Sequence, residues 1–312
     1  PRGRDSSESM MKAQYRSLCM LLLSTRSVAW HSSPLPLFRA LRPRAACFPT
    51  TAPQFAALSM AAKGGKGLAL DKLLQSQGFG TRKDCKEMVK NGYVQVNGEV
   101  VQDSNAKIQH EELMPFSVDG EDFEYRSAVY ILLNKPAGYE CSNKPTMNPG
   151  VLELLPDIYM MRGVQPVGRL DCDTTGMLLL SDQGAFNHAI TSPRRDKPKV
   201  YHVEAKHPVD AAQIRQLLQG VQLKDEKEGE TVTSPIKVAA AAVVSLSENV
   251  IALTLTQGKY HQVKRMLAAV GNRCERLQRV SIGPVSLGEI GLGDWRHLTD
   301  EEVVALKTKN YE

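Results

Sequence analysis

The fold of this 312-residue chain is decided by one stretch, Pro166-Val-Gly-Arg-Leu-Asp-Cys-Asp-Thr-Thr-Gly-Met-Leu-Leu-Leu-Ser181. At its centre, Arg169 and Asp171 place a cation and a carboxylate two positions apart in a predicted turn. The apolar run from Met177 to Leu180 that follows predicts a buried strand. A turn anchored by a buried strand can present its polar side chains to a cleft. Taken alone, the turn fits a surface loop with a salt-bridged Asp equally well.

Further segments extend this pattern in a fixed order. Together with the quoted stretch they resemble the motifs of the pseudouridine synthases, and in detail those of the RsuA branch, whose members modify small-subunit ribosomal RNA. The resemblance implies an α+β fold with a central, mostly antiparallel sheet and an active site in a cleft across it. The segments are Leu132–Tyr139, Asn187–Arg194, Lys199–Val203, Gln257–Met266 and Leu277–Pro284.

The same resemblance implies the roles of the site residues. In the family, the Asp of Gly-Arg-Leu-Asp is the catalytic carboxylate, which assigns that role to Asp171. Lys264 corresponds to the cation that keeps this carboxylate ionised, with Arg265 beside it as the alternative partner. Tyr201 corresponds to the tyrosine that lies against the uracil ring. A glycosidase-like acid–base pair of Asp171 with Asp173 is the competing interpretation.

The implied reaction detaches uracil from ribose, turns it and reattaches it through ring carbon five. It is an isomerisation, so we expect no cofactor and no metal. The carboxylate either attacks the anomeric carbon or removes the adjacent ribose proton, and the sequence favours neither route. The six cysteines include no Cys-x-x-Cys pair, which argues against a zinc site.

A uridine in folded RNA has to leave its stack to reach such a cleft. We expect Arg169 to fill the vacated space or to hold a phosphate. Other basic side chains are expected to line the path of the RNA backbone, and at each of them a solvated surface charge is the alternative. These are Arg194, Arg195, Lys197, Lys259 and Arg265.

Residues 67–118 predict a small separate domain. A short helix from Leu70 ends near Gly78, and a capping box at Thr81 and Asp84 begins a second helix that runs to Lys90. Asn97-Gly98 predicts a tight hairpin turn between two short strands. The pattern resembles the S-four RNA-binding domain.

The second helix of this domain is rich in cations. Residues 82, 86 and 90 follow an i,i+4 spacing, so one face of the helix can follow a phosphate backbone. An ordinary solvated helix face is the alternative. The cations are Arg82, Lys83, Lys86 and Lys90.

The net charge is distributed unevenly along the chain. Residues 1–66 carry a formal charge of +8 against +5 for the whole chain, so the remainder carries −3. An RNA-binding surface therefore has to come from local clusters of basic residues. The leader holds no Asp or Glu between Ser9 and Asp71, which is typical of transit peptides to the mitochondrion or the plastid. A disordered tail without an address is the alternative.

We therefore predict a leader over 1–66, an RNA-binding domain over 67–118, a linker over 119–128 and a catalytic domain over 129–312. Within the last, the charged segment 224–230 is expected to be a solvated loop between strands. The predicted function is the isomerisation of uridine in small-subunit ribosomal RNA by a monomer that binds no membrane. The alternatives are a large-subunit RNA target and a non-catalytic RNA-binding assembly factor.

Overall fold

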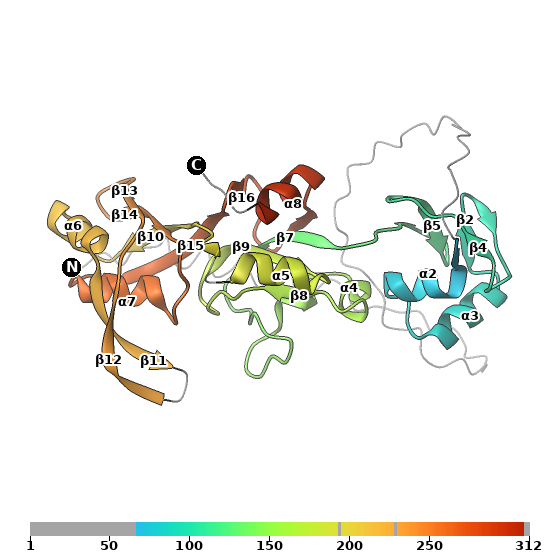
Figure 1. Ribbon diagram of the computed structural model, residues 1–312, viewed down its shortest axis with the longest axis horizontal. Coiled ribbons are helices and arrows are strands. Elements are labelled where there is room, and N and C mark those ends of the chain that lie inside the picture. The colour runs from blue at the N-terminus through green and yellow to red at the C-terminus, as the bar shows by residue number, and fades with distance from the viewer. Residues whose placement is uncertain (1–66, 193–194, 228–229, 309–312) are drawn as a thin grey trace, which may run out of the picture. The chain divides into compact units, whose positions relative to one another are not determined.

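A computed structural model of the chain describes residues 67–192, 195–227 and 230–308 (Figure 1). The predicted targeting leader and Arg194, one of the predicted RNA contacts, lie outside these residues. No helix in the described ranges is long and apolar enough to cross a bilayer.

The first domain begins with two helices, α2 (Leu70–Gln77) and α3 (Arg82–Lys90), as predicted. α2 ends at Gly78, which takes a left-handed conformation with φ 94°. The capping box of α3 is present: Asp84 Oδ2 accepts a hydrogen bond from the Thr81 amide at 2.9 Å, and Thr81 Oγ1 accepts one from the Asp84 amide at 3.4 Å. Local capping therefore sets where α3 begins.

A four-stranded antiparallel sheet of order β3-β2-β5-β6 packs with these helices. Asn97 and Gly98 form the predicted hairpin turn, with φ of 52° and 83°. The strands are β2 (Val94–Val96), β3 (Glu99–Val100), β5 (Pro115–Val118) and β6 (Glu121–Glu124), while β1 (Leu68–Ala69) pairs with β4 (Lys107–Ile108).

The segment 119–128, expected to be a linker, contains β6. Phe123 points from this strand into the domain core, where its ring centroid lies 4.9 Å from that of Phe79 and 5.7 Å from that of Phe116. Tyr125 is also buried in this core. The first domain therefore reaches at least residue 125. The packing of Phe123 makes this segment a strand of the domain, although the other three residues of β6 are acidic.

The second domain is built on a nine-stranded sheet with the main order β13-β14-β10-β15-β9-β7-β17 (Figure 1). All its neighbouring strands are antiparallel except β15 and β9. This arrangement confirms the predicted α+β class with a mostly antiparallel sheet. The strands are β7 (Tyr130–Lys135), β8 (Gln165–Val167), β9 (Thr175–Ser181), β10 (Lys199–Ala205), β13 (Ala242–Ser245), β14 (Val250–Leu255), β15 (Cys274–Ile282), β16 (Val285–Ser286) and β17 (Trp295–His297).

Helices and one long hairpin complete this domain. β11 (Val221–Lys227) pairs with β12 (Glu230–Val238), so the segment 224–230, expected to be a loop, mostly belongs to these two strands. The backbone pairing of β11 with β12 makes this segment a strand pair, although its charged residues are typical of a loop. The helices are η1 (Val151–Leu154), α4 (Asp157–Met161), α5 (Gly184–Thr191), α6 (Ala211–Gln219), α7 (Gln262–Ala269) and α8 (Asp300–Lys307).

The apolar run of β9 is buried because both faces of the strand are covered. Met177 and Leu179 pack in the cluster that contains Phe186 of α5, while Leu178 and Leu180 pack in a cluster on the other face. All four side chains are fully buried. A continuous apolar run is the expected sequence of such a strand.

A short parallel contact joins the two antiparallel parts of the sheet. It consists of Gln278 opposite Thr175 and Arg279 opposite Gly176. A Cβ atom on Gly176 would overlap the Arg279 carbonyl oxygen and lie 2.8 Å from the Arg279 nitrogen. Gly176 also has φ 100°, so glycine is required there for both space and conformation.

A buried lysine fixes the turn between β8 and β9. Lys135, at the end of β7, is fully buried, and its Nζ donates to the carbonyl oxygens of Pro136, Cys172 and Thr174 at 2.9, 3.1 and 2.9 Å. Burial lowers the pKa of Lys135. The three carbonyl dipoles compensate for the lost hydration of the ammonium group and tie residues 172–174 to β7.

We predict that Gly176→Ala lowers the free energy of unfolding by at least about 3 kcal/mol, because a methyl group there meets backbone atoms that cannot move aside. Gly184→Ala is the matched control, since a Cβ at this first residue of α5 meets nothing within 4 Å. Urea unfolding measures both variants. Equal midpoints would show that the strand contact tolerates the methyl group.

We predict that Lys135→Met destabilises the protein by roughly 3 kcal/mol or more, because three buried carbonyl groups lose their donor. Amide hydrogen exchange should accelerate at Gly138 and Thr174, whose amides bond to residues of the same turn. Lys144→Met, at an exposed lysine, is the control. Unchanged exchange in residues 171–175 would exclude this role of Lys135.

Candidate active site

Asp171 lies on the turn that connects β8 to β9. Leu170, the residue before it, is buried, and its amide donates to Cys141 Sγ at 3.4 Å. This contact holds the backbone directly before Asp171, while the Asp171 side chain keeps 29% of its surface exposed. A buried anchor with a half-exposed carboxylate matches the turn that the sequence predicts.

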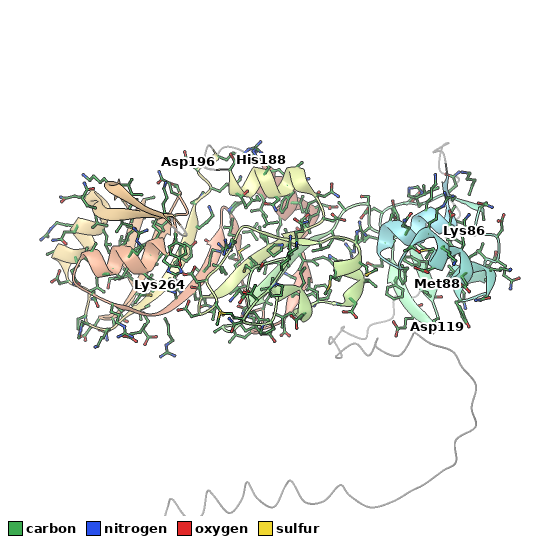
Figure 2. All side chains as sticks on the ribbon, turned by 90° about the horizontal axis from the view of Figure 1, so that it is seen from below. Lys86, Met88, Asp119, His188, Asp196 and Lys264 are labelled. Atoms are coloured by element: carbon green, nitrogen blue, oxygen red, sulfur yellow. The ribbon has the colours of Figure 1, made fainter. Side chains whose placement is uncertain are left out.

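Lys264, which is labelled in Figure 2, lies on α7 and brings a cation to this carboxylate. Its Nζ lies 3.2 Å from Asp171 Oδ2 and 2.6 Å from Asp173 Oδ1. Burial acts to lower the pKa of Lys264, but the hydrogen bonds and charges of Asp173 and Asp171 outweigh it and raise the pKa. The predicted pairing of Asp171 with Lys264 is therefore present in the structure, and Lys264 is held charged.

Asp173 is the second carboxylate on this cation. Burial acts to raise the pKa of Asp173, but the hydrogen bond and charge of Lys264 prevail and lower it. A carboxylate with a lowered pKa is a poor proton donor near neutral pH. This arrangement argues against the interpretation of Asp171 and Asp173 as an acid–base pair.

Tyr201 reaches the same region through the sheet. In register, Tyr201 of β10 lies opposite Arg279 of β15, and Arg279 lies opposite Gly176 of β9. The Tyr201 ring also packs against the apolar cluster that contains Leu170. Strand pairing therefore brings this tyrosine toward the Asp171 turn from 30 positions further along the chain.

His261 is a site residue that the sequence analysis did not single out. Its Nε2 lies 3.4 Å from Asp171 Oδ1. The residue immediately precedes α7 and has a left-handed backbone with φ 46° and ψ 33°. Its place in the motif Gln257–Met266, three positions before Lys264, was an available signal.

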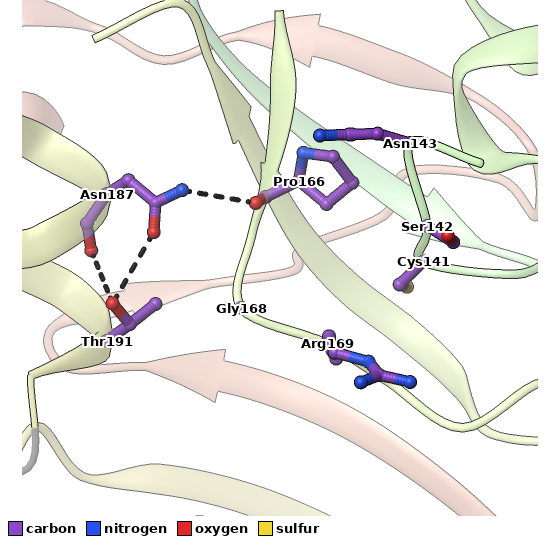
Figure 3. A pocket seen from close by; sticks show the side chains of 8 residues that line it. All are labelled: Cys141, Ser142, Asn143, Pro166, Gly168, Arg169, Asn187 and Thr191. Carbon is purple, nitrogen blue, oxygen red and sulfur yellow. Dashed lines mark hydrogen bonds between the residues drawn. The ribbon is translucent and has the colours of Figure 1, made fainter. Parts of the chain in front are cut away.

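A polar pocket opens beside the turn, with Arg169 on its wall (Figure 3). Its volume is about 370 Å³, within the range of small-ligand sites. Asn187 Nδ2 donates to the Pro166 carbonyl at 3.4 Å, and Thr191 Oγ1 donates to the Asn187 carbonyl at 2.8 Å, which fixes this wall. The lining residues are Cys141, Ser142, Asn143, Pro166, Gly168, Arg169, Asn187 and Thr191.

The predicted RNA-contacting residues of this domain lie in different environments. Arg169 and Lys259 are exposed. Arg265 donates to the Tyr260 carbonyl at 3.1 Å, so it supports the loop before α7. Arg195 donates to the Lys307 carbonyl at 3.2 Å. Lys197 is buried with its Nζ 2.6 Å from the Thr308 carbonyl oxygen, so the prediction that it lines an RNA path is wrong.

The cations of α3 also differ from one another. Arg82 Nε lies 2.6 Å from Oδ2 of the buried Asp71, and Lys86 Nζ lies 3.8 Å from the same atom. Lys83 and Lys90 are exposed, and with Lys86 they line a surface hollow of about 340 Å³. Arg82 therefore has a structural partner, while Lys83 and Lys90 face solvent.

In the part of the chain that the structure describes, no three His, Cys, Asp or Glu side chains are grouped as ligands for a metal ion. The groups that the structure assembles at the turn are a carboxylate, a lysine and a histidine. The carboxylate in such a group can act as a nucleophile or as a base.

Comparison with known proteins agrees with this geometry. A family profile described as RNA pseudouridylate synthase matches residues 129–269, and one described as S4 domain matches residues 70–113. The chain is 38% identical to ribosomal small subunit pseudouridine synthase A of Vibrio vulnificus, over 76% of this chain and 98% of that protein. It is 35% identical to the Escherichia coli protein of the same name, over 77% of this chain and 100% of the relative.

Two further relatives extend the comparison. An uncharacterized RNA pseudouridine synthase of Bacillus subtilis, YtzG, is 38% identical over 76% of this chain and 97% of its own length. A crystal structure of a pseudouridylate synthase superposes with a TM-score of 0.52 at 33% identity, and covers 76% of this chain and 98% of that one. The chain has an S4 domain for RNA binding and a pseudouridine synthase domain, and it matches these relatives over nearly their whole length. It belongs to the RNA pseudouridine synthase family.

Proposed function

We propose that this pseudouridine synthase isomerises a uridine of small-subunit ribosomal RNA, with Asp171 as the catalytic carboxylate. The observation that carries the proposal is the position of Asp171, on a turn held from the core and between Lys264 and His261 at 3.2 and 3.4 Å. The similarity to ribosomal small subunit pseudouridine synthase A supports the choice of RNA.

In the proposed reaction the uridine leaves its stack and places its ribose at Asp171. In one route the carboxylate bonds to the anomeric carbon as the bond to uracil N1 breaks, uracil turns, and ring carbon five displaces the carboxylate from that carbon. In the other route the carboxylate removes the adjacent ribose proton as N1 leaves, which gives a glycal, and the proton returns to the ribose when carbon five bonds to the anomeric carbon. In both routes carbon five then loses its proton and N1 gains one. Atoms and electrons balance without a further reactant.

The neighbours of Asp171 have separate roles in this scheme. Lys264 places its positive charge 3.2 Å from the carboxylate that meets the ribose. Tyr201 stacks on the uracil ring, and its hydroxyl assists removal of the proton from carbon five. Arg169, exposed beside the pocket, occupies the space that the uridine leaves or holds a phosphate.

We predict that Asp171→Asn lowers the rate of pseudouridine formation by at least about a thousandfold while RNA affinity stays within a few-fold. An amide of nearly the same shape cannot supply the chemistry of the carboxylate. Single-turnover assays on transcribed small-subunit ribosomal RNA measure the rate, and filter binding measures the affinity.

Asp173→Asn is the matched control, because Asp173 shares the same lysine. If Asp173 donated a proton in the reaction, its amide would cost about a hundredfold to ten-thousandfold. We expect a smaller loss, because Lys264 keeps its contact with Asp171. Full turnover by Asp171→Asn would remove Asp171 from its role.

The identity of the RNA target is tested separately from the role of Asp171. Pseudouridines are mapped in both ribosomal RNAs of cells with and without the protein. A missing pseudouridine in the small-subunit RNA supports the proposal, and one in the large-subunit RNA supports the alternative target. No change in either RNA would contradict both.

The S4 domain binds RNA, and we propose that the exposed cations of α3 meet phosphates. We predict that Lys83→Ala with Lys90→Ala reduces the salt slope of RNA binding by roughly 0.7–0.9 per lost phosphate contact. Lys206→Ala, an exposed lysine of the second domain, is the control. Identical slopes for the double variant and the wild type would show that this face touches no phosphate.

For residues 1–66 we propose an address to the mitochondrion or the plastid. The proposal rests on the composition of the segment, which is basic and nearly free of acidic residues. A fluorescent reporter fused behind these residues should enter one of the two organelles. A reporter that stays in the cytosol would contradict the proposal.

A further inference from the structure

An exposed aromatic ring lies next to the proposed catalytic cluster. Tyr260 keeps 46% of its surface exposed, although it directly precedes His261, whose side chain contacts Asp171. The two rings are stacked, with centroids 3.9 Å apart and planes inclined by 19°. The imidazole of His261 is in turn 3.4 Å from Asp171 Oδ1. The ring of Tyr260 is therefore connected to the proposed catalytic carboxylate through one side chain.

The loop that carries this ring is held in place by its own hydrogen bonds. The Lys259 amide donates to Gln262 Oε1 at 2.9 Å, and the Gln262 amide donates to the Lys259 carbonyl at 3.2 Å. The Arg265 guanidinium donates to the Tyr260 carbonyl at 3.1 Å. These bonds hold the backbone on both sides of Tyr260, from which its ring projects.

Packing in the core does not explain this arrangement. Tyr260 belongs to none of the apolar clusters of the described residues. His261 also adopts a left-handed backbone, which a residue with a side chain takes only at an energetic cost. Such strain is concentrated at sites of function. Here the strained residue is His261, whose ring stacks on Tyr260 and contacts Asp171.

We propose that Tyr260, backed by His261, stacks on a nucleobase of the substrate RNA that neighbours the reacting uridine. The inference rests on the proposed role of Asp171, because that carboxylate marks where the uridine binds. Every nucleobase presents a flat π-face, and an exposed tyrosine supported from behind by a second ring is suited to extend such a stack. The exposed Lys259 beside it can meet the phosphate of the same nucleotide.

Binding is measured with four proteins: the wild-type sequence at position 260 and Tyr260→Phe, Tyr260→Leu and Tyr260→Ala. All carry Asp171→Asn so that the RNA is not converted, and the probe is transcribed small-subunit ribosomal RNA. Loss of the ring in the Leu and Ala variants should weaken binding about five- to a hundredfold. The Phe variant should restore most of the affinity, because stacking requires the ring and not the hydroxyl.

Leu218→Ala is the control for the loss of an exposed apolar side chain, since Leu218 is 41% exposed on α6. It should bind as the wild type does. Equal affinities for the Phe and Leu variants would show that apolar volume alone is needed and would overturn the stacking proposal. Wild-type affinity of the Ala variant would overturn it as well.

The position of the stacked base needs a second readout. Once the modified uridine is mapped, 2-aminopurine is placed at the nucleotide on either side of it in a short RNA. Its fluorescence should be quenched by the protein with Tyr or Phe at 260 and not with Ala; quenching that does not depend on residue 260 would contradict the proposal. Continued turnover by Asp171→Asn would overturn the proposed function, whereas the comparisons of the residue-260 variants test the stacking itself, since they measure binding and not turnover.

Discussion

The proposed active site depends on one buried positive charge, that of Lys135. Lys135 holds the carbonyl groups of Pro136, Cys172 and Thr174 around its ammonium, and so ties the turn that carries Asp171 to the end of β7. A buried ammonium is costly unless polar groups surround it, so the turn has to close around the lysine for the domain to fold. Leu170 adds an apolar anchor on the same turn. Asp171 is thus positioned by the core, and its carboxylate needs no ion pair to stay in place.

The ion pairs with Lys264 place Asp171 and Asp173 in different environments. Lys264 lies closer to Asp173, at 2.6 Å, than to Asp171, at 3.2 Å. The side chain of Asp173 is 72% exposed and that of Asp171 only 29%, so the shorter bond lies on the solvent side. Asp173 therefore holds the lysine at the shorter distance, while Asp171, whose oxygens meet the ribose in the proposed reaction, lies at the longer one. Two carboxylates two positions apart acquire different properties because their surroundings differ.

Much of the fold could be predicted because the signals are local. The Thr81–Asp84 capping box, the Asn97-Gly98 turn and the buried run of β9 each depend on a few neighbouring residues. The errors arose where distant contacts decide: the acidic segment of β6 is a strand because Phe123 packs on Phe79 and Phe116. Lys197 was expected to line an RNA path, yet it is buried with its Nζ on a backbone carbonyl group that only the tertiary structure supplies. The burial of Lys135 on backbone carbonyl groups has no local signal either. The pairing of Asp171 with Lys264 came from the family motifs, since a separation of 93 positions gives no local signal.

The topology explains why the site lies where it does. The large sheet consists of two antiparallel parts, and β9 and β15 join them through only two residue pairs, with the backbones in close approach at Gly176. Asp171 belongs to the part that contains β7 and β9. Tyr201 and Lys264 belong to the part that contains β10, β14 and α7, whose apolar side chains form a core of their own. The proposed catalytic groups therefore meet across the join between the two parts. A side chain at Gly176 would meet the Arg279 backbone at this join, so its absence allows the two parts to approach closely.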